Sequence, residues 1–262
     1  MVGFRDLLRA LQSLQIPRTQ PVLVHASLSA FGQVGGGADT LLRALMANYD
    51  SLLAPTFTYK TMLIPESGPE HNACAYGSGK DANRMTEFFT PDMPADPLMG
   101  IIPETLRLQS HAARSTHPIL SFAGLNAAPL LEAQSLKEPL GPVRLLYDSQ
   151  GWVLLMGVDH TVNTSLHYAE RLAGRLQFVR WALTSNGVQV CEGFPGCSDG
   201  FQALHPHVAG AVRSLQVNGA SIQALPVVTL VDVALNLIRQ EADALLCSRP
   251  DCERCAAVRQ AL

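Results

Sequence analysis

Three short, largely apolar runs limit most strongly how this chain can fold. Residues 21–25 (PVLVH), 51–59 (SLLAPTFTY) and 152–158 (WVLLMGV) have the length of strands that are buried on both faces. Apolar residues at helical spacing occupy 3–15 and 38–48, and a Gly-rich loop joins the first strand to the second helix. This order of strand, loop, helix and strand predicts an α/β fold of mixed α+β character, with a central mixed sheet flanked by helices. The loop then lies at the carboxyl end of its strand, where ligands usually bind.

The remaining segments are predicted to complete a single domain over residues 1–262. Further elements are expected as helices at 101–109, 127–134, 163–172 and 227–240, and as an extended segment at 119–122. Residues 176–194 alternate around Asn186-Gly187, which is a strong short-range signal for a β-hairpin. Residues 60–100 are rich in Pro and Gly and show no clean period, and a loop of that length is usually functional or mobile.

Composition excludes several classes of partner. Of the 262 residues, 47% are hydrophobic and 16% charged, the formal net charge is -3, and no Lys/Arg-rich run occurs. A nucleic-acid or anionic-membrane surface is therefore not expected. The amino-terminal segment is interrupted by Arg5, Asp6 and Arg9, unlike a signal peptide, and no apolar run approaches the roughly 20 residues that span a bilayer. We expect a cytoplasmic protein, and the oligomeric state stays open.

The loop at 25–39 (HASLSAFGQVGGGAD) has the composition of a ligand-binding loop. Glycines at 35, 36 and 37 let the backbone approach a ligand closely, and the following helix N-terminus favours a phosphate or carbonyl oxygen. The loop is not a P-loop, because no Gly-Lys-Ser/Thr follows, and it does not fit a dinucleotide fingerprint. An ordinary Gly-rich turn is the alternative.

Two further segments carry candidate chemistry. In 114–118 (RSTHP), Pro118 forces an extended backbone at His117, although a loop histidine is more often a surface residue. In 157–170, His167 and Glu170 are three positions apart on a predicted helix, so they share a face. An imidazole beside a carboxylate suits a general base near neutral pH, and a solvated helix face is the alternative.

Five blocks in order give a resemblance to a known family. HASLSAFGQVGGGADTLLRAL, LLAPTFTY, TPDMPADPLMGIIPETLR, RSTHPILSFAG and GWVLLMGVDHTVNTSLHYAE resemble the aminoglycoside 3-N-acetyltransferase family of antibiotic-resistance enzymes. The resemblance covers roughly residues 20–175, which would carry the cofactor and catalytic motifs, and N-T-S-L-H-Y-A-E is its most specific part. It implies acetyl-CoA as donor, direct transfer to an amine, and a fold unrelated to the common GNAT superfamily.

The resemblance also implies roles for individual residues. The coenzyme A site would be formed by Ser27, Leu28, Ser29, Val34, Gly35, Gly36 and Gly37, with Arg114, Ser115 and His117 beside it. His167 would be the general base, supported by Glu170. Thr164, or backbone N–H groups near Ser27, would stabilise the oxyanion. No cysteine lies within the matched blocks, so an acetyl-cysteine route is disfavoured.

The acceptor implied by the family is an aminoglycoside, a small polyamine. A site for several ammonium groups should be lined with carboxylates. The candidates are Glu66, Glu70, Asp81, Glu87, Asp92, Asp96, Glu192 and Asp199. Two alternatives stay open: the same transfer onto a different small amine, and a non-catalytic protein that binds coenzyme A.

The cysteines favour a metal over disulfides, because the chain carries no secretion signal. Cys252-x-x-Cys255 has the spacing of a structural zinc knuckle, and Cys197 and Cys247 would complete an all-thiolate site. Substitute ligands are His205, His207 and Cys191. Zinc would then tie the tail to the hairpin region within residues 176–262, and the alternative is a set of idle thiols.

Overall fold

A computed structural model describes all residues from 1 to 262. Its main sheet has seven strands, in the order β4 (Ala112–Arg114), β5 (Phe122–Leu125), β2 (Leu52–Pro55), β1 (Val22–Ala26), β6 (Trp152–Met156), β10 (Ala220–Pro226) and β9 (Arg213–Val217). Strand β1 is parallel to β2 and β6, and the other neighbours are antiparallel. The mixed sheet predicted from the sequence is therefore confirmed.

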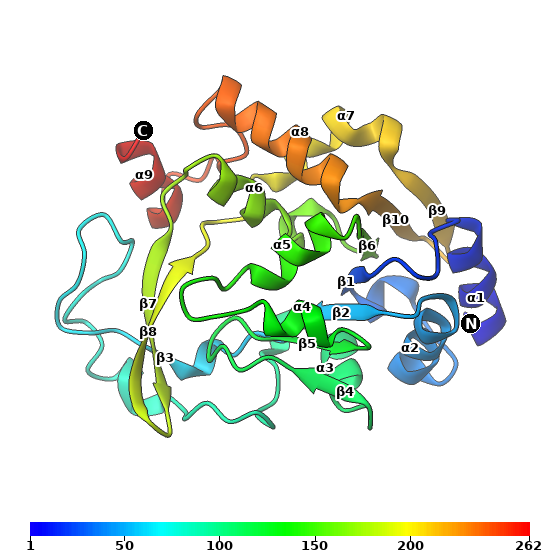
Figure 1. The fold of residues 1–262 in the computed structure, drawn as a ribbon, viewed down its shortest axis with the longest axis horizontal. Helices are drawn as coiled ribbons and strands as arrows, with labels where there is room; N and C mark the ends of the chain where they lie inside the picture. Colours follow the sequence, from blue (N-terminus) through cyan, green and yellow to red (C-terminus); the bar gives the residue numbers. More distant parts are fainter.

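Helices cover both faces of the main sheet (Figure 1). One face carries α1 (Phe4–Ser13), α2 (Gly37–Asn48) and α3 (Ile101–Arg107). The opposite face carries α4 (Ala128–Glu132), α5 (Gly141–Asp148), α6 (Leu166–Leu172) and α8 (Val227–Gln240). Two apolar clusters, of 26 and 33 buried residues, fill the spaces between the layers.

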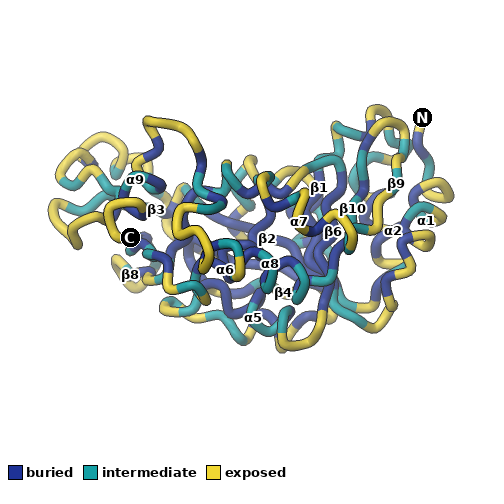
Figure 2. The backbone as a smooth tube through the Cα atoms, turned by 90° about the horizontal axis from the view of Figure 1, so that it is seen from above, coloured by how far each residue is buried: buried dark blue, intermediate teal, exposed yellow.

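The central strands are apolar, apart from His25 near the end of β1, because they serve both clusters. Along β6, Trp152, Leu154 and Met156 join the 26-residue cluster, while Val153 and Leu155 point to the 33-residue cluster. Successive side chains of a strand point to opposite faces, so a strand covered on both sides has no position for a polar residue. Figure 2 shows the buried backbone concentrated around β1, β2 and β6.

A second, smaller sheet lies at the end of the molecule opposite α1 and α2 (Figure 1). It contains β3 (Met62–Leu63), β7 (Phe178–Thr184) and β8 (Gly187–Phe194). The predicted hairpin is confirmed, and its turn falls on Ser185 and Asn186, with Gly187 at φ 94° opening β8. Helix α9 (Glu253–Gln260) lies beside this hairpin.

The remaining elements are short. Helix α7 covers His205–Val208, and 3₁₀ turns occupy Leu28–Phe31, Tyr59–Thr61, Ala82–Met85, Pro97–Met99, His160–Val162, Phe201–Leu204 and Ala209–Ala211. Residues 60–100 otherwise follow an irregular path, as predicted. The structure contains no helix with the length and apolar character needed to cross a bilayer.

Some boundaries differ from the sequence prediction. The extended segment expected at 119–122 becomes strand β5 only from Phe122 onward, because residues 118–120 form a turn. The β9–β10 hairpin was not predicted, although its turn carries Asn218-Gly219, with φ of 50° and 87°. Asn-Gly is favoured there because both turn positions need positive φ. This hairpin extends the main sheet by two strands on the β6 side.

Candidate active site

A pocket of about 530 Å³ opens at the carboxyl ends of the parallel strands. Strand β1 and the loop after it supply Val24–Ser27. Strand β2 and the segment after it supply Pro55, Phe57 and Tyr59, and the segment after β6 supplies Val158, Thr161, Val162 and Thr164. This edge, where neighbouring connections leave the sheet in different directions, is the usual ligand site of an open α/β sheet.

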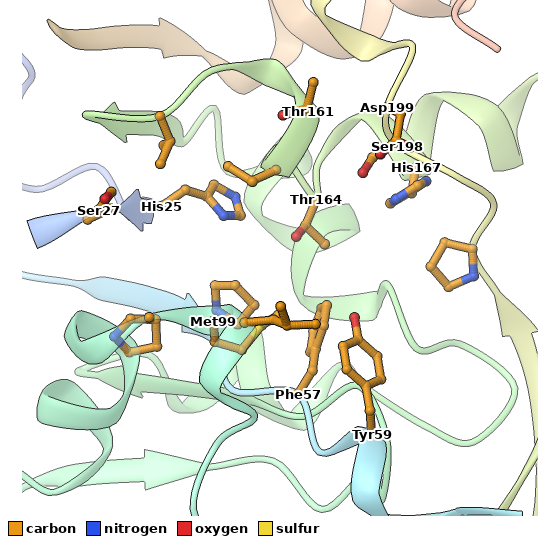
Figure 3. A pocket seen from close by; sticks show the side chains of 18 of the residues that line it. His25, Ser27, Phe57, Tyr59, Met99, Thr161, Thr164, His167, Ser198 and Asp199 are labelled. Atoms are coloured by element: carbon orange, nitrogen blue, oxygen red, sulfur yellow. The ribbon is translucent and has the colours of Figure 1, made fainter. Parts of the chain in front are cut away.

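The pocket has two ends (Figure 3). We call one the sheet end, formed by His25, Ala26 and Ser27. The other is the tail end, formed by the pocket-lining residues of 194–199, which are all but Cys197, and by Arg254. In Figure 3, Ser27 and His25 lie at one side, and Tyr59, Ser198 and Asp199 lie at the other. His167 lies near the tail end, with Thr164 between it and His25.

His167 and Glu170 form a buried pair on α6. His167 Nδ1 and Glu170 Oε2 are 2.7 Å apart, and the two residues are only 7% and 1% exposed. Every residue of α6 from Leu166 to Glu170 is buried, so the alternative of a solvated helix face does not apply. Because His167 lines the pocket, its imidazole joins a buried carboxylate to the space where a ligand would lie.

Arg175 fixes the second oxygen of Glu170. Its Nη1 donates to Glu170 Oε1 at 2.8 Å, and its Nη2 donates to the carbonyls of Ala242 and Ala244 at 2.7 and 2.8 Å. Both oxygens of the Glu170 carboxylate are thus engaged by positive or proton-donating groups. A carboxylate held this way favours the His167 tautomer that carries its proton on Nδ1, which leaves Nε2 as the proton acceptor.

The segment before α6 sets the position of Thr164. The fully buried Asn163 accepts bonds from the N–H and hydroxyl of Ser165 and lies 3.2 Å from His160 Nδ1. The helix consequently begins at Leu166, later than the sequence pattern suggested. The Thr164 side chain is left facing the pocket (Figure 3).

The Gly-rich loop contributes less side-chain surface to the pocket than predicted. Of its expected contacts, only Ser27 lines the pocket, and the Ser27 and Ser29 hydroxyls are 3.0 Å apart. The Gly35 N–H donates to the carbonyl of Val2 and the Gly37 N–H to that of Val34, so neither group is free. By contrast, the N–H groups of Leu28 and Ser29 begin a 3₁₀ turn and have no acceptor within it.

Arg114, Ser115 and His117 do not line the pocket. The Arg114 guanidinium donates to the Ser121 hydroxyl and to the backbone carbonyls of Thr56, Pro91 and Met93. The Ser115 hydroxyl bonds to the Phe122 backbone, and His117 Nδ1 accepts from the N–H groups of Ile119 and Leu120. In this structure the three side chains therefore hold neighbouring loops against the sheet, and contact with a cofactor stays a prediction.

His25, near the end of strand β1, lines the pocket, although the sequence analysis gave it no role of its own within the loop 25–39. It is 5% exposed, and its Nε2 is buried without a hydrogen-bond partner. Burial, and then the proximity of His160, lower the pKa of His25 to about 3, so its imidazole is neutral. Tyr59 and Met99 were also missed, although the matched block TPDMPADPLMG contains Met99.

Carboxylates are scarce in the pocket wall. Of the eight candidate acids, only Asp199 lines the pocket, and its Oδ2 lies 3.2 Å from Arg249 Nη2. Glu87 instead pairs with Lys60 at 3.3 Å. The other candidate acids therefore lie outside this pocket, whose lining also contains Arg254, and a carboxylate-rich acceptor wall stays a prediction.

The four predicted metal-ligating cysteines lie together. Cys197, Cys247, Cys252 and Cys255 are buried, and their sulfur atoms all lie within 4.8 Å of one another. In a tetrahedral zinc site with Zn–S distances of about 2.3 Å, the sulfurs are about 3.8 Å apart, so the donor set fits such an ion. The substitutes His205, His207 and Cys191 are not part of this cluster.

The cluster also borders the tail end of the pocket. Cys197 lies within residues 194–199, and Arg254 lies between Cys252 and Cys255. Arg254 Nη1 donates to the carbonyl of Gly196 at 2.9 Å, which joins the two segments directly. The cysteine cluster and the tail end of the pocket are therefore formed by the same two segments of the chain.

These observations define a class: an α/β protein whose strand-end pocket carries a carboxylate-oriented histidine suited to moving a proton. The chain belongs to the aminoglycoside 3-N-acetyltransferase family, whose model matches residues 23–239. It is 32% identical over 180 residues to the aminoglycoside N(3)-acetyltransferase VIII of Streptomyces fradiae, a match covering 64% of this chain. The chain spans about 60% of the length of that relative.

Solved structures show the same fold. The apoenzyme of the aminoglycoside acetyltransferase AAC(3)-IVa has a TM-score of 0.80 at 23% identity, covering 100% of this chain and 98% of that one. AAC-IIIb, solved as a binary complex with CoASH, has a TM-score of 0.75 at 20% identity, covering 91% and 97%. A mutant of AAC(3)-IVa has also been solved in complex with a gentamicin.

Proposed function

We propose that this chain is an acetyl-CoA-dependent N-acetyltransferase that uses His167 as its general base. The observation that carries the proposal is the buried Glu170–His167 pair, 2.7 Å between Oε2 and Nδ1, on the wall of a strand-end pocket. Family membership supports the reaction, and the CoASH complex of AAC-IIIb supports the donor. The 3-amino group of an aminoglycoside is the acceptor that the names of the relatives indicate, and acetylation would confer resistance.

The residues suggest how the transfer proceeds. An ammonium has no lone pair with which to attack, so the acceptor amine reacts as the free base after it has lost its ammonium proton to solvent, and His167 Nε2 takes the second proton from the nitrogen during the attack. The amine nitrogen then bonds to the thioester carbonyl carbon, and the carbon–sulfur bond breaks from the tetrahedral intermediate. The coenzyme A thiolate leaves and recovers the proton from the imidazolium, which Glu170 stabilises. The products are an acetamide and CoASH.

Developing charge on the carbonyl oxygen needs hydrogen-bond donors. The Thr164 hydroxyl and the N–H groups of Leu28 and Ser29 are the candidates, since they lie at the pocket or at the start of its 3₁₀ turn. Losing one oxyanion donor typically costs about 100- to 1000-fold in rate. His25 lies in the same lining, and its Nε2 has no partner within the protein.

A thiol-release assay with acetyl-CoA and an amine panel tests the proposal. His167→Ala should lower kcat by about 100- to 10,000-fold, while the matched control His207→Ala, at an exposed position, should match the wild type. Unchanged turnover in His167→Ala would exclude this residue as the base. Binding of coenzyme A without turnover of any amine would favour the non-catalytic alternative.

A different small amine is the second candidate acceptor. The observation that favours it is the pocket lining, in which the one carboxylate, Asp199, is already paired with Arg249. Several ammonium groups of an aminoglycoside would find little compensating charge there.

We also propose that the four-cysteine cluster holds a structural zinc ion. Four buried thiols whose sulfur atoms lie within 4.8 Å of one another support the presence of the ion. A Cys₄ site leaves no open position for a substrate, so the role of the ion would be structural. Metal analysis of the purified protein should find about one zinc per chain, and Cys252→Ser should lower that content. Wild type that is purified without chelator and contains no zinc would contradict the proposal.

A further inference from the structure

His25 brings a second imidazole to the pocket, at the end away from His167. It is 5% exposed, and Nε2 is its ring nitrogen that protein encloses without a hydrogen-bond partner, so Nδ1 is the nitrogen that reaches the pocket. Figure 3 shows Thr164 between the His25 ring and His167. An acetyl group held in this space would have the base on one side and the His25 ring on the other. A buried polar side chain on a pocket wall calls for a ligand group that it binds.

The tautomer of His160, which adjoins His25, follows from its contact with Asn163. Asn163 Oδ1 accepts from the N–H and the hydroxyl of Ser165, so its amide nitrogen is the atom that lies 3.2 Å from His160 Nδ1. An amide nitrogen only donates, so His160 Nδ1 accepts. Burial, and then the proximity of His205, lower the pKa of His160 to about 4, so the ring is neutral and its one proton is on Nε2.

His160 Nε2–H is thus a fixed donor beside His25. The two rings are close enough that His160, after burial, contributes to lowering the pKa of His25 to about 3, so His25 is also neutral with one ring proton. His205, whose ring centroid is 6.1 Å from that of His160, adds a third buried nitrogen without a partner, Nδ1.

These three nitrogens constrain the proton of His25. A water molecule donates two hydrogen bonds, so water between the rings can accept from His160 and donate to both His25 Nε2 and His205 Nδ1. A proton on His25 Nε2 would instead place a second N–H group beside that of His160, and a buried donor left unsatisfied is costly. The arrangement therefore favours the His25 tautomer that carries its proton on Nδ1, toward the pocket.

We propose, resting on the acetyl transfer given above, that His25 Nδ1–H donates a hydrogen bond to the carbonyl oxygen of the acetyl thioester. As the amine nitrogen bonds to the carbonyl carbon, one electron pair of the carbon–oxygen double bond moves onto oxygen, and the bond from His25 strengthens. The proton stays on Nδ1, and the pair returns when the carbon–sulfur bond breaks. Neutral imidazoles polarise substrate carbonyls in this way in other enzymes. His25 is then a catalytic residue, and His160 and Asn163 are positioning residues.

Infrared spectroscopy on the complex with acetyl-CoA, isotopically labelled at the thioester carbonyl carbon, reports this hydrogen bond directly. The carbonyl stretch should lie at lower frequency in the wild-type complex than in free acetyl-CoA, and His25→Leu should move it back toward the free value. Calorimetry confirms that both proteins are saturated. Equal frequencies in the two complexes would overturn the proposal. No amine is present, so the result does not depend on which acceptor the enzyme uses.

Three substitutions of His25 separate a catalytic role from a structural one in the thiol-release assay. His25→Leu should lower kcat by about 100-fold, as expected for one oxyanion donor, with KM for both substrates nearly unchanged. His25→Asn puts an amide nitrogen near the position of Nδ1 and should recover about tenfold of that loss. His25→Gln puts it near Nε2 and should not. Equal kcat in the Asn and Gln variants would contradict a donor at Nδ1, and His207→Asn, at an exposed position, should match the wild type.

Nitrogen NMR of histidine-labelled protein reads the tautomers themselves, with His25→Leu and His160→Phe to assign the signals. Wild type should carry its protons on His25 Nδ1 and His160 Nε2, and a His25 proton on Nε2 would overturn the proposal. His160→Phe should give mixed His25 tautomers and a lower kcat, and an unchanged His25 tautomer with unchanged kcat would remove His160 from the positioning role. A loss of turnover in His167→Ala with none in His25→Leu would leave the transferase proposal standing and reject the role of His25.

Discussion

The two ends of the pocket are held in place by different forces. The sheet end is the continuation of β1, which lies between β2 and β6 with apolar clusters of 26 and 33 residues on its two faces. The tail end is continuous with β8 and α9, where a separate cluster consists of four cysteines. Hydrophobic burial places the first end, and thiol chemistry with a few arginine bonds places the second. The two ends should therefore respond to different perturbations.

Arg175 joins α6, which carries His167, to the segment that leads to Cys247, so removing it should have the largest effect. Arg175→Met leaves the Glu170 carboxylate buried without its cation, and breaking a buried ion pair in this way costs about 3–5 kcal/mol. It also releases the carbonyls of Ala242 and Ala244 in the segment that leads to Cys247. Urea unfolding measures the loss, and the second substitution Glu170→Gln should recover part of it. No recovery would show that the bonds to the tail, and not the charge, dominate.

A truncation in the sheet should be almost as costly. Leu154 is fully buried on β6, and Leu154→Ala should lower the free energy of unfolding by about 2–5 kcal/mol. Val190→Ala in β8, at a position 48% exposed, should change it by less than about 0.5 kcal/mol. Equal losses at the two positions would contradict the contrast drawn between the regions.

A fall in pH should destabilise the fold first at the sheet end. Burial lowers the pKa of His25 to about 3 and that of His160 to about 4, while the unfolded chain titrates near 6.5. The unfolded state therefore binds more protons below pH 6.5, so stability falls as the pH drops from there toward these values. At pH 5 the loss is about 2 kcal/mol for each histidine. Urea titrations at pH 7 and 5 test it, and His25→Leu should show the smaller pH dependence.

Metal removal should produce the smallest and most local effect. A chelator should speed amide exchange in residues 194–199 and 247–258 by about tenfold or more, equivalent to about 1.4 kcal/mol of local stability. Amides of β1 and β6 should keep their protection, because their clusters do not depend on the cysteines. Loss of protection across the main sheet would show that the tail supports the whole fold.

The same contrast explains what could be predicted from the sequence. The buried strands and the pair of His167 and Glu170 were predicted because their signals are local: apolar runs, and two residues one helical turn apart. The tail end depends on contacts between distant segments, such as Arg254 with Gly196 and Arg175 with Ala242, and no local pattern encodes them. The four cysteines were an exception, since metal-ligand chemistry makes even distant thiols conspicuous.

Two differences from the sequence analysis have specific physical causes. Arg114, Ser115 and His117 do not line the pocket, because their side chains bond to residues around β5, and a polar side chain gives no sign of its partner in the sequence; their contact with a cofactor stays a prediction. The β9–β10 hairpin was missed because β9 is largely exposed, so its apolar content is low, although Asn218-Gly219 marked the turn.

The pairing of β1 with β6 also bears on the route by which the chain folds. Val22 pairs with Trp152, 130 positions further along the chain (152 minus 22), so the centre of the sheet closes a very long loop. Such distant pairings are slow to form, because chain entropy is lost before contacts compensate it. His25 lies near the end of β1, Thr164 lies in the segment that follows β6, and the two approach each other only once the strands have met. Partly folded states can therefore contain helices before the residues of the pocket come together.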